Sequence, residues 1–122
     1  MTHAIDESVL LSSLDGDEGL LVELIDAFLA ESEGLLEKVR DAVDRHDAAR
    51  LERAAHSLKG TVSIFGLQEA TAAAEALESM GRARHLQDAA ALGARVGDEV
   101  RELRRQLSDL KEKLLLQSFR HR

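Results

Sequence analysis

The pentapeptide His56-Ser57-Leu58-Lys59-Gly60 combines a potential nucleophile, a cation one turn later and a glycine, all within a helical pattern. A helix advances about 100° per residue, which places His56 roughly 150° from the apolar stripe of its helix. A neutral imidazole, with a reference pKa of about 6.5, is a good nucleophile for phosphorus and needs no separate base. Lys59 falls on the same side and could set its ammonium group against phosphoryl oxygens. The pentapeptide therefore predicts a solvent-facing site suited to phosphoryl transfer.

Gly60 is the residue that most sharply separates such a site from an ordinary surface histidine. Glycine inside a helix costs about 1 kcal/mol relative to alanine, so its presence needs a reason. Four residues after His56, it removes a side chain that would crowd the approach to the imidazole. Two other interpretations stay open. Gly60 could permit a close helix crossing, and His56 could be an ordinary surface histidine on a structural helix. The direction of Gly60, away from the apolar stripe, and the adjacent Lys59 favour the reactive site.

Apolar residues recur at three- and four-residue steps along most of the chain, which is typical of amphipathic helices. The absence of Pro agrees with a mostly helical protein. We expect a short helix near 7–14 and long helices at about 17–45, 48–65, 67–80 and 86–118. Four long helices with short links predict an all-α fold, an antiparallel four-helix bundle with a short extra N-terminal helix and a long C-terminal helix.

Several residues mark the expected ends of these helices. The segment 15–17, Asp-Gly-Asp, interrupts the apolar pattern, and Asp47 is placed to cap the helix that follows it. Gly66 stands where a left-handed residue closes a helix, and Gly81 is expected to end the next one.

The last helix is longer than a compact bundle needs, because about 33 residues span about 50 Å. Its apolar stripe continues at regular steps from Val96 to Leu114. We therefore expect one domain over residues 1–122, with a core at about 5–105 and a C-terminal helix extension at 106–122. A monomer is the expected state, and a dimer formed through the extended helix is the alternative.

The composition argues against several classes of function. Without Cys, the chain has no disulfide, thiolate metal site or cysteine nucleophile. A net charge of −7 disfavours nucleic acid as a partner. No apolar run approaches the ~20 residues of a membrane span, and no signal peptide is recognisable, so we expect a cytoplasmic protein without membrane contact. No P-loop or Asp-rich metal site is present, so we expect no cofactor or metal of its own and no autonomous kinase activity.

The sequence around the pentapeptide resembles the signature of histidine-containing phosphotransfer (HPt) domains. The resemblance rests on His-Ser-Leu-Lys-Gly-Thr at 56–61, with Ala-Ala at 54–55 before it and Phe-Gly-Leu at 65–67 after it. It covers roughly residues 5–105. It implies a four-helix bundle that relays phosphoryl groups between aspartates of response-regulator receiver domains, downstream of a sensor histidine kinase, which can be a hybrid one. Such a protein is a phosphorelay intermediate, phosphotransferase-like in its chemistry.

The resemblance also implies a role for each site residue. His56 would be the phosphoacceptor, normally at Nε2, Lys59 would contact the phosphate, and Gly60 would give access. Glu78 matches a Glu or Gln that in some members holds the other ring nitrogen, which would fix the tautomer. Glu75, one turn earlier, is the competing candidate, and Glu78 could equally be an ordinary solvated residue.

A receiver docked over this helix is expected to contact Glu52, Arg53, Ser57 and Ser63, together with part of the first helix. The receiver would also bring Mg²⁺ and most of the charge stabilisation that phosphoryl transfer requires. Two other functions stay open on the sequence alone. One is a regulatory module that binds a receiver or a kinase without transfer, and the other is a structural dimer built on the last helix.

Overall fold

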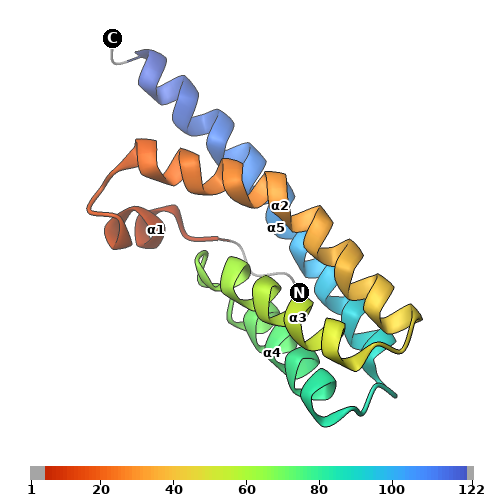
Figure 1. Ribbon diagram of the computed structural model, residues 1–122. Helices are drawn as coiled ribbons and strands as arrows, with labels where there is room; N and C mark the ends of the chain where they lie inside the picture. Colours follow the sequence, from red (N-terminus) through yellow and green to blue (C-terminus); the bar gives the residue numbers. More distant parts are fainter. Residues whose placement is uncertain (1–4, 121–122) are drawn as a thin grey trace.

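The computed structural model describes residues 5–120, and this part of the chain folds into five α-helices (Figure 1). They are α1 (Glu7–Ser13), α2 (Glu18–Asp44), α3 (Ala48–Ser63), α4 (Gln68–Ala83) and α5 (Ala89–Arg120). The four long helices form a closed antiparallel bundle, in which α3 packs between α2 and α4, and α5 packs on the other sides of α2 and α4. The short α1 lies at one end of the bundle, beside the start of α2 (Figure 1). The predicted all-α bundle is confirmed.

Local signals at the helix ends explain where α3 begins and where it stops. The Asp47 side chain accepts a hydrogen bond from the backbone N–H of Arg50, which satisfies a donor that the first turn leaves unpaired. After α3, Gly66 adopts φ 71°, a left-handed conformation that costs glycine little. These two features hold the ends of the helix that carries His56, and both agree with the sequence-based prediction.

The predicted end of α4 at Gly81 is wrong. The helix continues through Gly81 to Ala83, and the chain turns at Arg84, which has φ 60°. Gly81 is buried against α3, and a Cβ atom there would lie 2.6 Å from the backbone nitrogen of Glu52 and 2.8 Å from the carbonyl oxygen of Ala48. Gly81 therefore allows the backbones of α3 and α4 to touch, and it does not form a turn.

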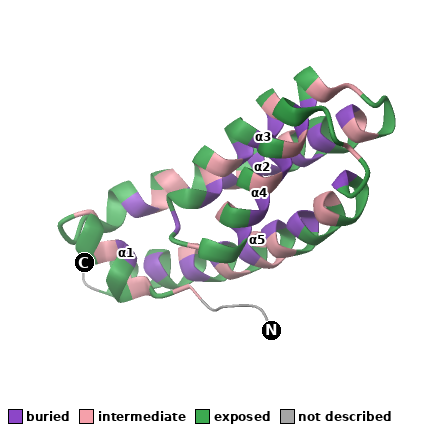
Figure 2. Cartoon of the chain, turned by 90° about the horizontal axis from the view of Figure 1, so that it is seen from below, coloured by how far each residue is buried: buried purple, intermediate pink, exposed green. Residues whose placement is uncertain are grey.

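A single apolar core runs along the inside of the bundle, where the buried positions of each helix face the others (Figure 2). The rings of Phe28 and Phe65 pack edge to face, with their centroids 5.3 Å apart. No helix within residues 5–120 is long and apolar enough to cross a membrane. The largest fully buried side chains come from every long helix: Leu21, Ile25, Phe28, Leu51, Leu58, Val62, Leu77, Val96, Val100, Leu103, Leu107 and Leu114.

The apolar stripe of α5 is buried inside the chain itself. It belongs to the common core as far as Leu114, whose exposed fraction is 2%, so the packing continues past residue 105. Near this point the Lys113 ammonium group donates to the Glu7 carboxylate of α1 at 2.9 Å. Only the last turns of α5, which carry the exposed Leu115 and Phe119, extend beyond the other helices (Figure 1). The apolar stripe that suggested a dimer is thus buried against the other helices of the same chain.

Candidate functional site

His56 lies in the middle of α3 on the side that faces away from the core. Its side chain is 68% exposed, whereas Ala55, one residue before it, and Leu58, two residues after it, are fully buried. The alternation follows from helical geometry, because neighbours in sequence point in directions about 100° apart. The structure therefore presents an accessible imidazole on a helix whose opposite side is anchored in the core.

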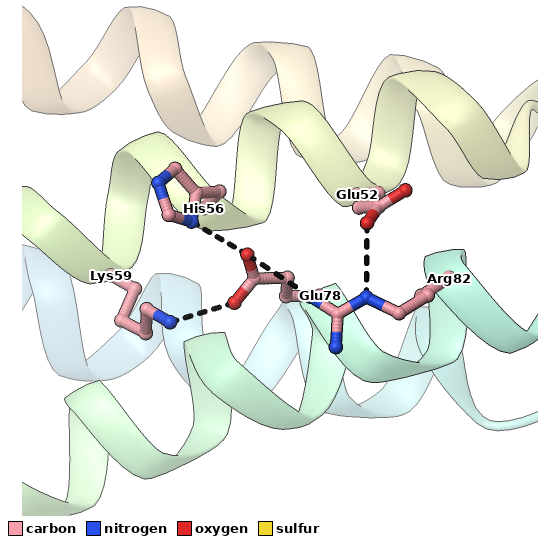
Figure 3. Close-up of polar contacts among 5 residues, drawn as sticks. All are labelled: Glu52, His56, Lys59, Glu78 and Arg82. Carbon is pink, nitrogen blue, oxygen red and sulfur yellow. Dashed lines mark hydrogen bonds and ion pairs between the residues drawn. The ribbon is translucent and has the colours of Figure 1, made fainter.

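Glu78 of α4 lies beneath the imidazole of His56 (Figure 3). Its Oε2 atom is 2.6 Å from Nδ1 of His56, and only 7% of its side chain is exposed. Glu75, the competing candidate, lies on the exposed side of α4. Of the two carboxylates, the packing of α4 on α3 brings Glu78 to the histidine.

Lys59 contacts the second oxygen of the Glu78 carboxylate. Its Nζ atom donates to Oε1 of Glu78 at 2.8 Å, and its side chain is 29% exposed (Figure 3). This hydrogen bond is the largest cause that lowers the pKa of Glu78 below the ordinary value of 4.5, and the His56 contact acts in the same direction against the cost of burial. Glu78 is therefore ionised at neutral pH.

The ionised carboxylate determines which ring nitrogen of His56 carries the hydrogen. A carboxylate can only accept hydrogen bonds, so the Nδ1 atom that faces Glu78 must be the N–H donor in the neutral ring. The Nε2 atom then keeps its lone pair, and it points away from Glu78 (Figure 3). In the neutral ring, Nε2 is therefore the nitrogen that is able to attack phosphorus.

Arg82 and Glu52 form an ion pair beside Glu78, and the sequence analysis did not predict this pair. Nε of Arg82 donates to Oε2 of Glu52 at 3.1 Å, and Nη2 of Arg82 lies 3.6 Å from Oε2 of Glu78 (Figure 3). Glu52 was expected only in the docking surface, and Arg82 was not singled out. The four-residue spacing of Glu78 and Arg82 on one helix was the available signal, since such pairs share a helix face.

Gly60 is exposed, and a Cβ atom added to it would meet no other atom within 4 Å. A close helix crossing therefore does not explain this glycine. The open space above Gly60 adjoins His56 on the exposed side of α3. The close crossing in this part of the fold belongs to Gly81 instead.

The residues expected to dock a partner lie along the outer side of α3. Arg53, Ser57 and Ser63 are exposed, and Glu52 is half-buried and pairs with Arg82. The Ser63 hydroxyl donates to the carbonyl oxygen of Gly60 at 3.0 Å. The side of α3 around His56 is thus mostly free of packing against the rest of the bundle.

A hollow of about 890 Å³ opens at the end of this side, between α1, the turn after α3 and the middle of α5. Ser63 lines it, together with the exposed apolar side chains of Val9 and Ile64. Sequence reasoning did not find this hollow, because it depends on how α1 is placed against the turn that joins α3 to α4. No group of three or more His, Cys, Asp or Glu side chains within residues 5–120 is arranged to hold a metal ion.

Comparison with known proteins agrees with this geometry. The model of the Hpt domain family matches residues 23–113. The crystal structure of histidine-containing phosphotransfer protein B (HptB) from Pseudomonas aeruginosa PAO1 is similar, with a TM-score of 0.81 and 29% sequence identity, over 89% of this chain and 95% of that chain. Curated protein sequences give no match. Because the family model spans most of its length, the chain belongs to the Hpt domain family.

Proposed function

We propose that this chain is a histidine phosphotransfer protein of a two-component phosphorelay. It accepts a phosphoryl group on His56 from a phosphorylated aspartate and passes it to the aspartate of a second receiver domain, and a sensor histidine kinase feeds the relay. The observation that carries the proposal is the contact between Nδ1 of His56 and the Glu78 carboxylate, which in the neutral ring leaves the lone pair on Nε2 of an exposed side chain. Family membership and the likeness to HptB support it.

The transfer step uses the lone pair of Nε2. This pair forms the N–P bond while the P–O bond to the receiver aspartate breaks, and the electrons of that bond return to the aspartate carboxylate. Because Nδ1 keeps its hydrogen, the phosphorylated ring of His56 is an imidazolium, and the Glu78 carboxylate at 2.6 Å offsets its positive charge. In the second transfer the N–P bond breaks, and a neutral imidazole leaves with its electron pair restored.

Lys59 has two roles in this scheme. In the structure its ammonium group bonds Glu78 at 2.8 Å. We propose that it turns to the phosphoryl oxygens when His56 is modified, while the receiver supplies Mg²⁺ and the chain itself supplies no cofactor. Lys59→Ala is therefore expected to slow transfer without unfolding the bundle, and Lys38→Ala, which changes an exposed lysine of α2, is the matched control. An unchanged transfer rate in Lys59→Ala would remove this residue from the mechanism.

The receiver is proposed to dock on the outer side of α3 around His56 and to reach the hollow beside α1. The exposed Arg53, Ser57 and Ser63 supply polar contacts, and Ile64 supplies an apolar one. The burial of the α5 stripe within one chain supports a monomer as the docking unit. The cytoplasmic location expected from the sequence stays a prediction.

Incubation with a phosphorylated receiver and Mg²⁺ tests the function. The unmodified chain should take up the label, His56→Gln should not, and His85→Gln, which changes an exposed histidine in the link after α4, should behave as the unmodified chain. Equal labelling of His56→Gln would contradict the assignment. A receiver that binds the chain tightly and leaves no label on it would favour the regulatory module without transfer.

A further inference from the structure

Arg82 connects two carboxylates that come from different helices, and one of them holds the reactive histidine. We propose that Arg82, fixed by Glu52, is a positioning residue that holds the Glu78 carboxylate under His56 when Lys59 turns away to the phosphoryl group. The inference deepens the proposed function, because it rests on a phosphoryl group arriving at His56.

The contacts run without a gap from α3 to α4 and back to α3. Glu52 of α3 accepts from Nε of Arg82 at 3.1 Å, and Nη2 of Arg82 lies 3.6 Å from Oε2 of Glu78. This Oε2 atom is the one that faces Nδ1 of His56 at 2.6 Å. Glu52 lies one helical turn before His56, so this series of contacts begins and ends on α3. We call Glu52, Arg82 and Glu78 the carboxylate clamp.

The two oxygens of Glu78 have different cations beside them. Oε1 bonds Lys59, and Oε2 lies near Arg82 as well as His56. A phosphoryl group brings a charge of about −1.5 to −2, which attracts the flexible Lys59 ammonium and repels the Glu78 carboxylate. Once Lys59 has turned, Arg82 is the cation that the clamp keeps beside Glu78. It keeps the carboxylate in place, so that Oε2 continues to accept from Nδ1 of the ring.

The backbone contact at Gly81 explains why Arg82 is well placed for this role. Gly81 precedes Arg82 and packs directly on the backbone of Glu52, where a Cβ atom would come within 2.6 Å of the Glu52 nitrogen. The backbones of α3 and α4 are therefore in contact beside the residues that bear the clamp. The Arg82 guanidinium, although its side chain is 63% exposed, has only a short distance to span.

The test uses the full-length chain and two measurements that do not need a receiver. The first is the fraction of the neutral His56 ring with hydrogen on Nδ1, read from ¹⁵N NMR of the imidazole. The second is the rate of His56 phosphorylation by phosphoramidate, a small donor that is insensitive to the docking surface. The variants are Arg82→Gln and Glu52→Gln, each also combined with Lys59→Ala. Arg84→Gln is the control, because it removes the same charge from an exposed residue outside the clamp.

Exposed ion pairs have small effects, so Arg82→Gln alone is expected to slow phosphorylation about twofold to fivefold. The loss should be larger when Lys59 is alanine, since the two cations support the same carboxylate. Both clamp variants should lower the fraction of the ring with hydrogen on Nδ1, and Arg84→Gln should change neither quantity. An unchanged fraction, together with effects of the Arg82 and Lys59 substitutions on the activation free energy that simply add, would overturn the clamp. Absence of any phosphorylation of the unmodified chain would count against the proposed function instead, and the NMR measurement would still decide the positioning role.

Discussion

Nδ1 of His56 and Oε2 of Glu78 lie 2.6 Å apart across the interface between α3 and α4, although 22 residues separate them in the sequence. One partner is largely exposed, and the other is 7% exposed. The contact therefore joins a reactive surface group to a carboxylate whose position is determined by helix packing. Its consequence is a defined tautomer on a side chain that would otherwise rotate freely in solvent.

Glu78→Ala should remove this control of the ring. We expect a mixture of neutral tautomers in ¹⁵N NMR and a loss of about tenfold in the phosphorylation rate, the lower end of the effect of removing a carboxylate that orients a metal-ligating histidine. Glu78→Gln should lose less, because its amide oxygen can still accept from Nδ1. Glu75→Ala, on the exposed side of the same helix, is the control. An Ala variant with the rate and tautomer of the unmodified chain would contradict the role of Glu78.

The stability of the fold should depend on the charge of Glu78 in acid. The hydrogen bond from Lys59, first among several causes, holds the pKa of Glu78 below its ordinary value of 4.5 in the folded chain. A carboxyl group whose pKa is lower in the folded state stabilises the fold above its unfolded pKa, and this contribution is lost as the pH falls through the folded pKa.

The free energy of unfolding of the unmodified chain should therefore fall more steeply than that of Glu78→Gln as the pH is lowered from about 5 to about 3. Urea denaturation at a series of pH values measures both curves. Asp6 and Glu102 also have lowered pKa values, but they are common to both proteins and cancel in the difference. Parallel curves would show that Glu78 has the same pKa in the folded and unfolded chains.

The helices and the exposed direction of His56 could be predicted because both depend on a local repeat. Buried positions such as Leu51, Ala55 and Leu58 recur at steps that place His56 on the opposite side, whatever the helix packs against. The choice between Glu75 and Glu78 depends instead on how α4 is rotated against α3. The periodicity of one helix does not contain that rotation, so only the family resemblance pointed to Glu78.

The role of Gly81 also depends on helix packing, which the sequence of a single helix does not reveal. The prediction that Gly81 ends α4 used a rule that holds for many helices, but here the missing side chain serves a contact with the backbone of Glu52. A lone glycine near a helix end is compatible with both roles, and the difference lies in what is opposite it. Arg82 was overlooked for a related reason, since its partner Glu52 lies 30 residues earlier on another helix.

Alanine at the two glycines should have opposite effects on stability. Gly81→Ala would press a methyl group against backbone atoms of α3, so we expect a loss of about 1–3 kcal/mol in the free energy of unfolding. Gly60→Ala meets open space and should raise stability by about 0.5–1 kcal/mol through helix propensity. Chemical denaturation measures both changes.

The transfer rate should separate Gly60 from any other exposed helical glycine. We expect Gly60→Ala to slow phosphorylation of His56 by a receiver, because its methyl group would stand one helical turn after His56 on the exposed side of α3, where the receiver is proposed to dock. Gly34→Ala on α2, which also meets no atom within 4 Å, should gain similar stability without any change in rate. A Gly60 variant that transfers as fast as the Gly34 variant would show that access does not depend on this glycine.

The end of α5 should divide into a part that stabilises the bundle and a part that does not. A chain that stops after Ser108 loses Leu110 and Leu114, which are 8% and 2% exposed, and should lose about 3 kcal/mol or more of unfolding free energy. A chain that stops after Leu114 keeps the whole buried stripe and should be nearly as stable as the full chain. Because that stripe already packs inside one chain, sedimentation should find monomers in all three cases. A dimer of the full chain that becomes a monomer after removal of residues 115–122 would instead place a contact between copies on the exposed last turns of the helix, where Leu115, Leu116 and Phe119 lie.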